Sequence, residues 1–152
     1  MRLRPFVLAL LPLALSACLG DSSTTTNFPL VPIESTTFAT SLGVNLAAST
    51  KTASGLYYRD ITVGTGKTIV AGDSINVKYS GALANGSVFD PGTRPFGFTI
   101  PGNVIQGWNE GMLGMKIGGS RQLIIPPSLG YGANGRGPIP PNAVLVFTVE
   151  PQ

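Results

Sequence analysis

The stretch NVIQGWNEGMLG, residues 103–114, decides the fold because it carries the one helical pattern of the domain. Val104, Trp108 and Met112 recur every four residues, which places their side chains on one face of a helix. Asn103 is a suitable N-cap for that helix. A helix this short needs a larger element on which to bury its apolar face, and a twisted sheet curling round it would bury both.

Strand patterns lie on both sides of this helix in the sequence. Residues 74–79 alternate between apolar and polar side chains, as a half-buried strand does. Asn85-Gly86 between two apolar runs predicts a hairpin turn. Further strands are predicted at residues 55–62, 96–100, 121–125 and 144–149, the last two with alternating or continuous apolar character. We therefore predict an α+β fold, in which a twisted antiparallel sheet of about five strands wraps around one short helix.

Residues 126–142 form a long segment without a regular pattern. The segment is seventeen residues long and rich in glycine. A loop of that length inside a compact domain is usually functional. We therefore expect it to border a site.

Composition excludes several classes of chemistry. The 152-residue chain has no histidine and one cysteine, so Ser-His-Asp and Cys-His catalysis, a Cys/His zinc site and an intrachain disulfide are all excluded. We expect no metal and no cofactor. Removal of Arg2 and Arg4 with the leader described below leaves 8 basic against 7 acidic residues, a net charge of +1. That near-neutral balance does not indicate the positively charged surface that binds nucleic acid.

The first residues predict a targeting signal rather than a folded element. Residues 1–4 are basic and residues 6–15 almost wholly apolar, which is typical of a secretory signal peptide. The segment ends in LSAC, residues 15–18, which resembles the bacterial lipobox with Cys18 as the lipidated residue. Leu19, rather than an aspartate, follows the cysteine and favours the outer membrane over the inner one. An ordinary signal peptide with a chance cysteine, or an uncleaved anchor, is the alternative.

Three regions follow from these patterns. Residues 1–17 are the predicted signal peptide, residues 18–54 a lipidated cysteine with a Ser/Thr-rich linker and an arm, and residues 55–152 the folded domain. Scattered apolar residues between positions 28 and 54 are compatible with an arm that packs on the domain, and we assign it no elements. The expected location is the cell envelope, on the outer membrane facing the periplasm, after export.

From residue 55 onward the chain resembles the FKBP family of peptidyl-prolyl isomerases. The order and spacing of the matching segments agree along about a hundred residues, and together they are far more specific than any one alone. They are GLYY at 55–58, VKYSG at 77–81, VFD at 88–90, PFGF at 95–98, VIQGWNEG at 104–111, YGA at 131–133, IPPNA at 139–143 and LVF at 145–147.

The resemblance implies a pocket of ring side chains. Its floor would be Trp108, while the Tyr131 hydroxyl and the Ile105 backbone N–H would donate hydrogen bonds to carbonyl groups of the ligand. Asp90, before a proline, is either a turn former or a group at the pocket edge. The segment from 91 to 95 is shorter than in many members, which leaves open whether Arg94 reaches Asp90. The implied catalytic residues are Tyr79, Phe89, Asp90, Trp108, Tyr131 and Phe147, and the implied substrate-binding residues are Phe96, Val104, Ile105, Ile139 and Arg94.

The resemblance also implies an activity, namely cis–trans isomerisation of X–Pro bonds in exported proteins, which assists folding at the cell envelope. Proline-containing polypeptides, macrolide inhibitors of the family and a membrane, through the lipid anchor, are the implied partners. Two alternatives remain open at this point. The same fold can serve as a non-catalytic module that binds proline peptides or acts as a chaperone, or the chain can be a structural surface lipoprotein.

Overall fold

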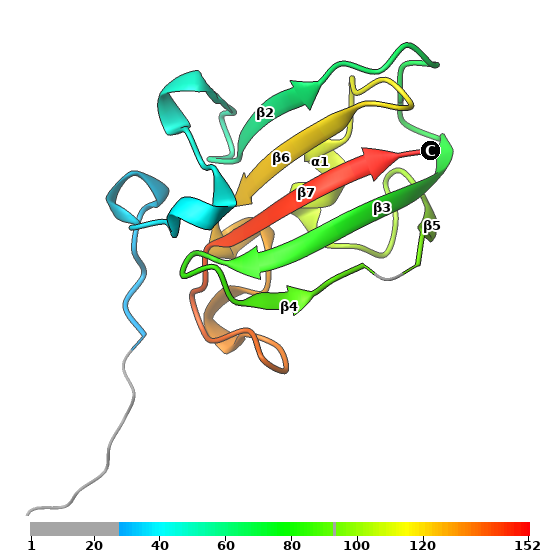
Figure 1. Cartoon of the computed structure of the whole chain (residues 1–152). Coiled ribbons are helices and arrows are strands. Elements are labelled where there is room, and N and C mark those ends of the chain that lie inside the picture. The colour runs from blue at the N-terminus through cyan, green and yellow to red at the C-terminus, as the bar shows by residue number, and fades with distance from the viewer. Residues whose placement is uncertain (1–27, 93) are drawn as a thin grey trace, which may run out of the picture.

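One antiparallel sheet forms the body of the described part of the chain, residues 28–92 and 94–152 of a computed structural model (Figure 1). Its seven strands follow the order β1-β2-β6-β7-β3-β4, and β5 pairs with β3 on the same edge as β4. Their bounds are β1 Thr50–Lys51, β2 Tyr57–Thr62, β3 Ser74–Leu83, β4 Val88–Asp90, β5 Phe96–Thr99, β6 Ser120–Ile125 and β7 Leu145–Pro151.

The predicted antiparallel sheet with one short helix is confirmed, and the estimate of about five strands omitted the short β1 and β4. The hairpin between β3 and β4 forms at Asn85-Gly86. The Asn85 side-chain oxygen accepts a hydrogen bond from the Ser87 N–H at 2.9 Å, and Gly86 has a φ of +89°, which favours glycine. The predicted signal peptide and Cys18 lie outside the described residues. Within the residues described, no helix is long and apolar enough to span a bilayer.

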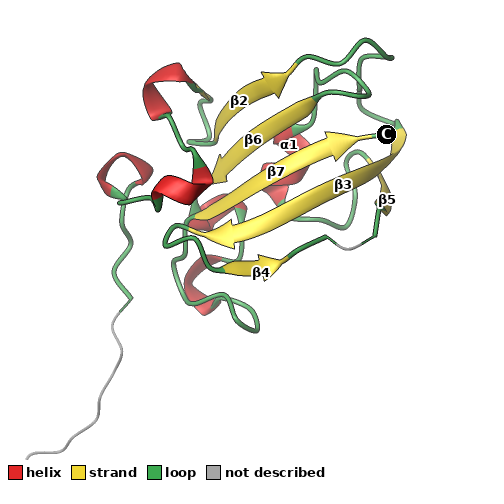
Figure 2. Ribbon diagram, in the orientation of Figure 1, coloured by secondary structure: helices red, strands yellow, loops and turns green. Residues whose placement is uncertain are grey.

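The helix α1, Gln106–Gly111, packs on one face of the sheet (Figure 2). Trp108 and Met112 are buried there in the main core. A Cβ at Gly107 would lie 2.6 Å from the Ile125 side chain, so a glycine is needed for this close approach of helix and strand. The predicted N-cap was wrong: the cap position is Ile105, which makes no side-chain capping bond.

The loop before α1 is held by Asn109 instead. The buried Asn109 carboxamide accepts from the Gly102 N–H at 2.8 Å and donates to the Gly102 carbonyl at 3.2 Å. These two bonds tie residues of the helix to the loop that precedes it. The side chain therefore satisfies the N–H and the carbonyl of a loop residue that the fold partly removes from water.

Arg121 fixes the other end of the helix. Its guanidinium, on β6, donates to the Gly111 carbonyl at 2.8 Å and forms two bonds with the Asp60 carboxylate, at 2.6 and 3.0 Å. It also lies over the Tyr58 ring, 4.5 Å from the ring centre. A cation at the C-terminal end of a helix satisfies free carbonyls and complements the helix dipole. The helix is thus anchored to β2 and β6.

Residues 28–54 form an arm that packs against one end of the opposite face of the sheet (Figure 1). The arm contains three short 3-10 turns, η1 Ile33–Ser35, η2 Thr40–Leu42 and η3 Leu46–Ala48. Side chains alternate across β6 and β7, so Leu123, Ile125, Leu145 and Phe147 face the helix while Ile124 and Val146 face the arm. The second core consists of Ile33, Tyr57, Ile124, Val144 and Val146, with Phe38, Leu42, Val44 and Leu46 packed against it.

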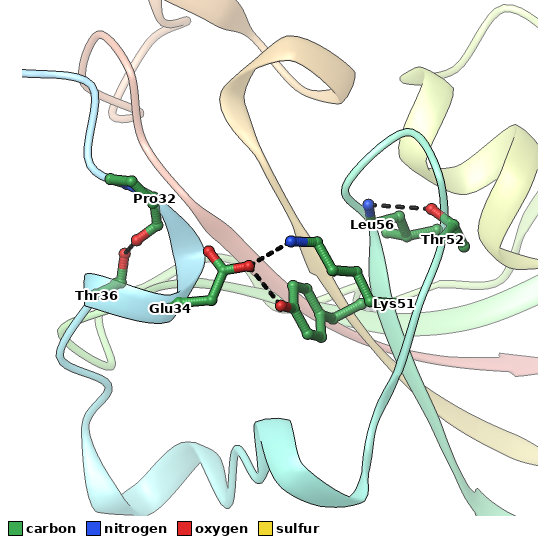
Figure 3. Close-up of polar contacts among 7 residues, drawn as sticks. Pro32, Glu34, Thr36, Lys51, Thr52 and Leu56 are labelled. Atoms are coloured by element: carbon green, nitrogen blue, oxygen red, sulfur yellow. Dashed lines mark hydrogen bonds and ion pairs between the residues drawn. The ribbon is translucent and has the colours of Figure 1, made fainter.

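Polar contacts add to this apolar packing of the arm. The Leu42 carbonyl accepts from Gln122 at 2.7 Å. The Glu34 carboxylate accepts from the Tyr57 hydroxyl. It also pairs with Lys51, as Figure 3 shows. Lys51 first, and the Tyr57 hydroxyl second, lower the pKa of Glu34 to about 2. The arm therefore belongs to the packed structure and joins β2 through both apolar and charged groups.

Candidate active site

A cavity of about 500 Å³ opens on the helix side of the sheet. It lies between β3, β4, β7, the start of α1 and the long loop between β6 and β7. That loop contains the 3-10 turns η4 Pro127–Leu129 and η5 Gly132–Asn134. A site of this size suits a small ligand or a short peptide segment. Its lining consists of Tyr79, Phe89, Asp90, Phe96, Asn103, Val104, Ile105, Trp108, Tyr131, Arg136 and Phe147.

Ring side chains form the floor and walls of the cavity. Trp108, 5% exposed, lies edge to face with Tyr79 and Phe147, at centroid distances of 4.9 and 5.3 Å. Phe89 meets Phe147 edge to face at 5.5 Å. Phe96 is 44% exposed and stands 6.5 Å from Trp108. Edge-to-face contacts are the favoured geometry between aromatic rings, so these rings hold one another in place around an apolar space.

Asp90 is both a turn former and a pocket group. One carboxylate oxygen accepts from the Gly92 N–H at 3.1 Å and so closes the turn after β4. The other accepts from the Tyr79 hydroxyl at 2.8 Å, inside the cavity lining. Burial, followed by the bond to Asp90, raises the pKa of Tyr79 to about 12. Tyr79 therefore stays a neutral donor at physiological pH and fixes the carboxylate.

The two donors implied for ligand carbonyls both border the cavity. Within residues 28–92 and 94–152, neither the Ile105 backbone N–H nor the Tyr131 hydroxyl has a hydrogen-bond partner. The buried Trp108 indole nitrogen also lacks an acceptor there. Because Ile105 precedes the first turn of α1, its N–H is one of the groups that a helix leaves unpaired. The Ile105 N–H and the Tyr131 hydroxyl are therefore free to bond to a ligand.

Two of the predicted site residues do not line the cavity. Ile139 is buried in the main core, 6% exposed, because it anchors a tight turn of the long loop. Arg94 is exposed and makes no ion pair with Asp90 in the part of the chain described, and the Asp90 carboxylate accepts from Tyr79 and Gly92 instead. The structure brings the other nine predicted residues together.

Two lining residues were not predicted, Asn103 and Arg136. Arg136 stands in the long loop that was expected to border a site, so the loop was identified but its side chain was not. Asp90 is the sole carboxylate of the lining. In the described ranges no cluster of three or more metal-ligating side chains occurs.

Comparison with known proteins gives one consistent result. The family model described as FKBP-type peptidyl-prolyl cis-trans isomerase matches residues 65–151. The FK506-binding protein of Neisseria meningitidis serogroup B is 48% identical over 101 residues, which cover 63% of this chain and 93% of that protein. FK506-binding protein 4 of Dictyostelium discoideum is 50% identical over 100 residues, or 64% of this chain and 28% of that protein. The chain thus spans about a quarter of the length of such larger relatives.

Solved structures agree with this similarity. The crystal structure of FkpA from Escherichia coli has a TM-score of 0.64 and 38% identity, covering 68% of this chain and 50% of that one. The crystal structure of AtFKBP13 has a TM-score of 0.63 and 40% identity, covering 67% of this chain and 94% of that one.

Proposed function

The chain belongs to the FKBP-type peptidyl-prolyl cis-trans isomerase family, and on that premise we propose that it isomerises X–Pro bonds in polypeptides. The observation that carries the proposal is the cavity floored by Trp108 and walled by Tyr79, Phe89 and Phe147. Its rings are held by one another, and its volume of about 500 Å³ leaves room for a proline and its neighbours.

The reaction is a rotation, so the site needs neither a nucleophile nor a general base. The barrier of about 18–20 kcal/mol arises because the nitrogen lone pair is delocalised into the carbonyl. That delocalisation places charge on the carbonyl oxygen, which water stabilises. The twisted transition state loses much of this charge separation. A water-poor aromatic cavity therefore disfavours the planar ground state more than the twisted one, which lowers the barrier.

The polar groups of the lining orient the peptide. The prolyl ring rests on the Trp108 indole, while the Ile105 N–H and the Tyr131 hydroxyl donate to carbonyl oxygens on either side of the reacting bond. Tyr79 holds the Asp90 carboxylate at the cavity edge. Fixed donors of this kind position the substrate without a loss of freedom during the reaction.

A protease-coupled or magnetisation-transfer assay with a Leu-Pro peptide tests the activity. We expect Trp108→Leu and Phe89→Leu to lower kcat/KM at least about tenfold, which corresponds to a loss of about 1.4 kcal/mol. The matched control is Lys78→Ala, because Lys78 follows Val77 on β3 and its side chain is exposed on the other face from Tyr79. An isomerisation rate that stays at the uncatalysed value with saturating protein would refute the enzymatic proposal and leave a proline-binding module.

We also propose that the cavity binds macrolides of the FK506 class, which the names of several relatives report for those proteins. Trp108 is the sole tryptophan of the sequence and forms the floor, so its fluorescence reports on occupancy directly. We expect a change in emission and loss of isomerase activity at the same FK506 concentration. A saturating change in emission with full retained activity would separate the macrolide site from the catalytic one.

For the cellular setting, we propose a lipid anchor at Cys18 and a role in folding exported proteins at the cell envelope, on the outer membrane facing the periplasm. The support is sequence alone, namely the basic start, the apolar run and the LSAC stretch at 15–18. Expression in a bacterial host should place the wild-type chain in the membrane fraction and Cys18→Ser outside it or unprocessed. Mass spectrometry of the N-terminal peptide should show acyl chains on Cys18. An unmodified Cys18 in the membrane fraction would contradict the anchor.

A further inference from the structure

We infer that Arg136 gives the cavity a preference for prolines that have an acidic residue as a neighbour. This inference refines the substrate class of the proposed isomerase and rests on that same site. It starts from a cation in the lining that the isomerisation itself does not use.

The backbone of Arg136 is held in a tight turn of the long loop. Its N–H donates to the Ile139 carbonyl, and the Ile139 N–H donates to its carbonyl, both at 2.9 Å. Ile139 is buried in the main core and so fixes this turn to the domain. A Cβ at the preceding Gly135 would lie 2.3 Å from the Ile139 carbonyl oxygen, so the turn is closely packed as well. The Arg136 side chain therefore starts from a fixed point.

The guanidinium lies over Tyr131, which the proposed function assigns to substrate orientation. Its central carbon is 5.8 Å from the centre of the Tyr131 ring, within the range of a cation–π contact. Arg136 lines the cavity and is exposed, and it makes no ion pair with any residue in the described ranges. The charge is thus placed beside the peptide and remains available to it.

The other charged group of the lining forms no ion pair with Arg136 among the described residues. Asp90 is the sole carboxylate there, and its two oxygens accept from Tyr79 and from Gly92. A substrate carboxylate next to Tyr131 would therefore meet the guanidinium, whose planar fork binds carboxylates with two parallel hydrogen bonds. Asn103, also exposed in the lining, offers a further carboxamide donor. A lysine in the same position of the substrate would be repelled.

The effect is that of one solvent-exposed ion pair. We expect a Glu-containing peptide to exceed its Gln counterpart about 1.4- to 5-fold in kcat/KM at low salt. In 1 M salt, where the screening length is only about 3 Å, the two peptides should become equal. The Gln peptide is the proper reference because it has the same shape without the charge.

The experiment uses the full chain and two peptide pairs, Ala-Glu-Pro-Phe with Ala-Gln-Pro-Phe and Ala-Leu-Pro-Glu with Ala-Leu-Pro-Gln. The Glu-to-Gln ratio is measured for the wild type, Arg136→Gln and Arg136→Lys. We expect the ratio above 1 for at least one pair, reduced to 1 in Arg136→Gln and partly restored in Arg136→Lys. Lys116→Gln removes an equal charge outside the cavity lining and should leave the ratio unchanged.

The same ratio is measured in binding, by titrating each peptide against Trp108 fluorescence. This readout does not depend on catalysis. A Glu preference in binding without any isomerisation would uphold this inference and refute the proposed activity. Ratios of 1 for both pairs in the wild type, or a ratio that persists in Arg136→Gln, would overturn it.

Discussion

Replacement of Gly81 by alanine perturbs the cavity without removing any of its groups. Gly81 is buried on β3, behind two of the ring walls. A Cβ built there would lie 2.6 Å from Phe147 Cε1 and 2.8 Å from Phe89 Cε2, whereas ordinary contacts begin at 3.4 Å. The Phe147 ring must therefore move by about 0.8 Å, and Phe89 by a similar amount, in a closely packed surrounding.

Two consequences follow from that displacement. Overpacking costs about 1–3 kcal/mol of unfolding free energy. A shift of about 1 Å in a group that positions substrate can cost about a hundredfold in rate, so we expect a fall in kcat/KM of about 10- to 100-fold for Gly81→Ala. Chemical denaturation measures the first quantity and a Leu-Pro peptide assay the second.

The neighbouring Ser80→Ala is the matched control, because Ser80 is exposed and faces away from the rings. Wild-type stability and activity in Gly81→Ala would refute the described packing of both walls. A loss of stability with full activity would show that Phe89 and Phe147 serve the core and not the reaction.

Three further predictions concern the arm and the loop before the helix. Ile33→Ala should lower the unfolding free energy by about 2–5 kcal/mol, against about 0.5 kcal/mol or less for the exposed Leu30→Ala, and equal effects in denaturant titrations would show that the arm is not docked. The pKa of Glu34 is lowered from 4.5 to about 2, so the stabilisation of the fold by the Glu34 carboxylate is fully present above pH 4.5 and lost as the pH falls towards 2. The melting temperatures of wild type and Glu34→Gln should therefore converge over that range. A constant difference would contradict the pairing of Glu34 with Lys51. Asn109→Leu leaves the Gly102 N–H and carbonyl without their partners and should cost about 1–3 kcal/mol in denaturant titrations, with a raised KM because the loop leads to Ile105; an unchanged KM would separate that loop from substrate binding.

Features set by neighbouring residues could be predicted from the sequence. The alternation at 74–79 appears as buried Ile75 and Val77 between exposed neighbours. The Asn85-Gly86 turn depends on a side chain two residues from its partner and on a left-handed glycine. The family motifs similarly located nine of the residues that line the cavity, because those residues come in short runs with fixed spacing.

Features set by distant residues could not be predicted in the same way. The N-cap at Asn103 was wrong because the buried Asn109 carboxamide, six positions on, decides how the loop enters the helix. The positions of Ile139 and Arg136 could not be predicted because a turn orients the first into the core and the second towards Tyr131.

The docking of the arm was the largest feature that the sequence patterns left open. Its apolar residues have no strict period, and their partners on β6 and β7 lie about a hundred positions away. A signal was nevertheless present in the continuous apolar runs at 123–125 and 144–147, which indicate strands buried on both faces. On sequence grounds the helix covers one face of these strands, and no element is assigned to cover the other face.

The arm also imposes an order of assembly on the growing chain. Ile33 is synthesised before the apolar surface that receives it, which includes Val144 and Val146 about 110 positions further along the chain. Contacts across such a separation form late, since the intervening chain must first be closed into a loop. The first described segment to leave the ribosome is therefore among the last to find its place. Until β7 pairs between β6 and β3, Ile124 and the arm residues remain open to chaperones or to other chains.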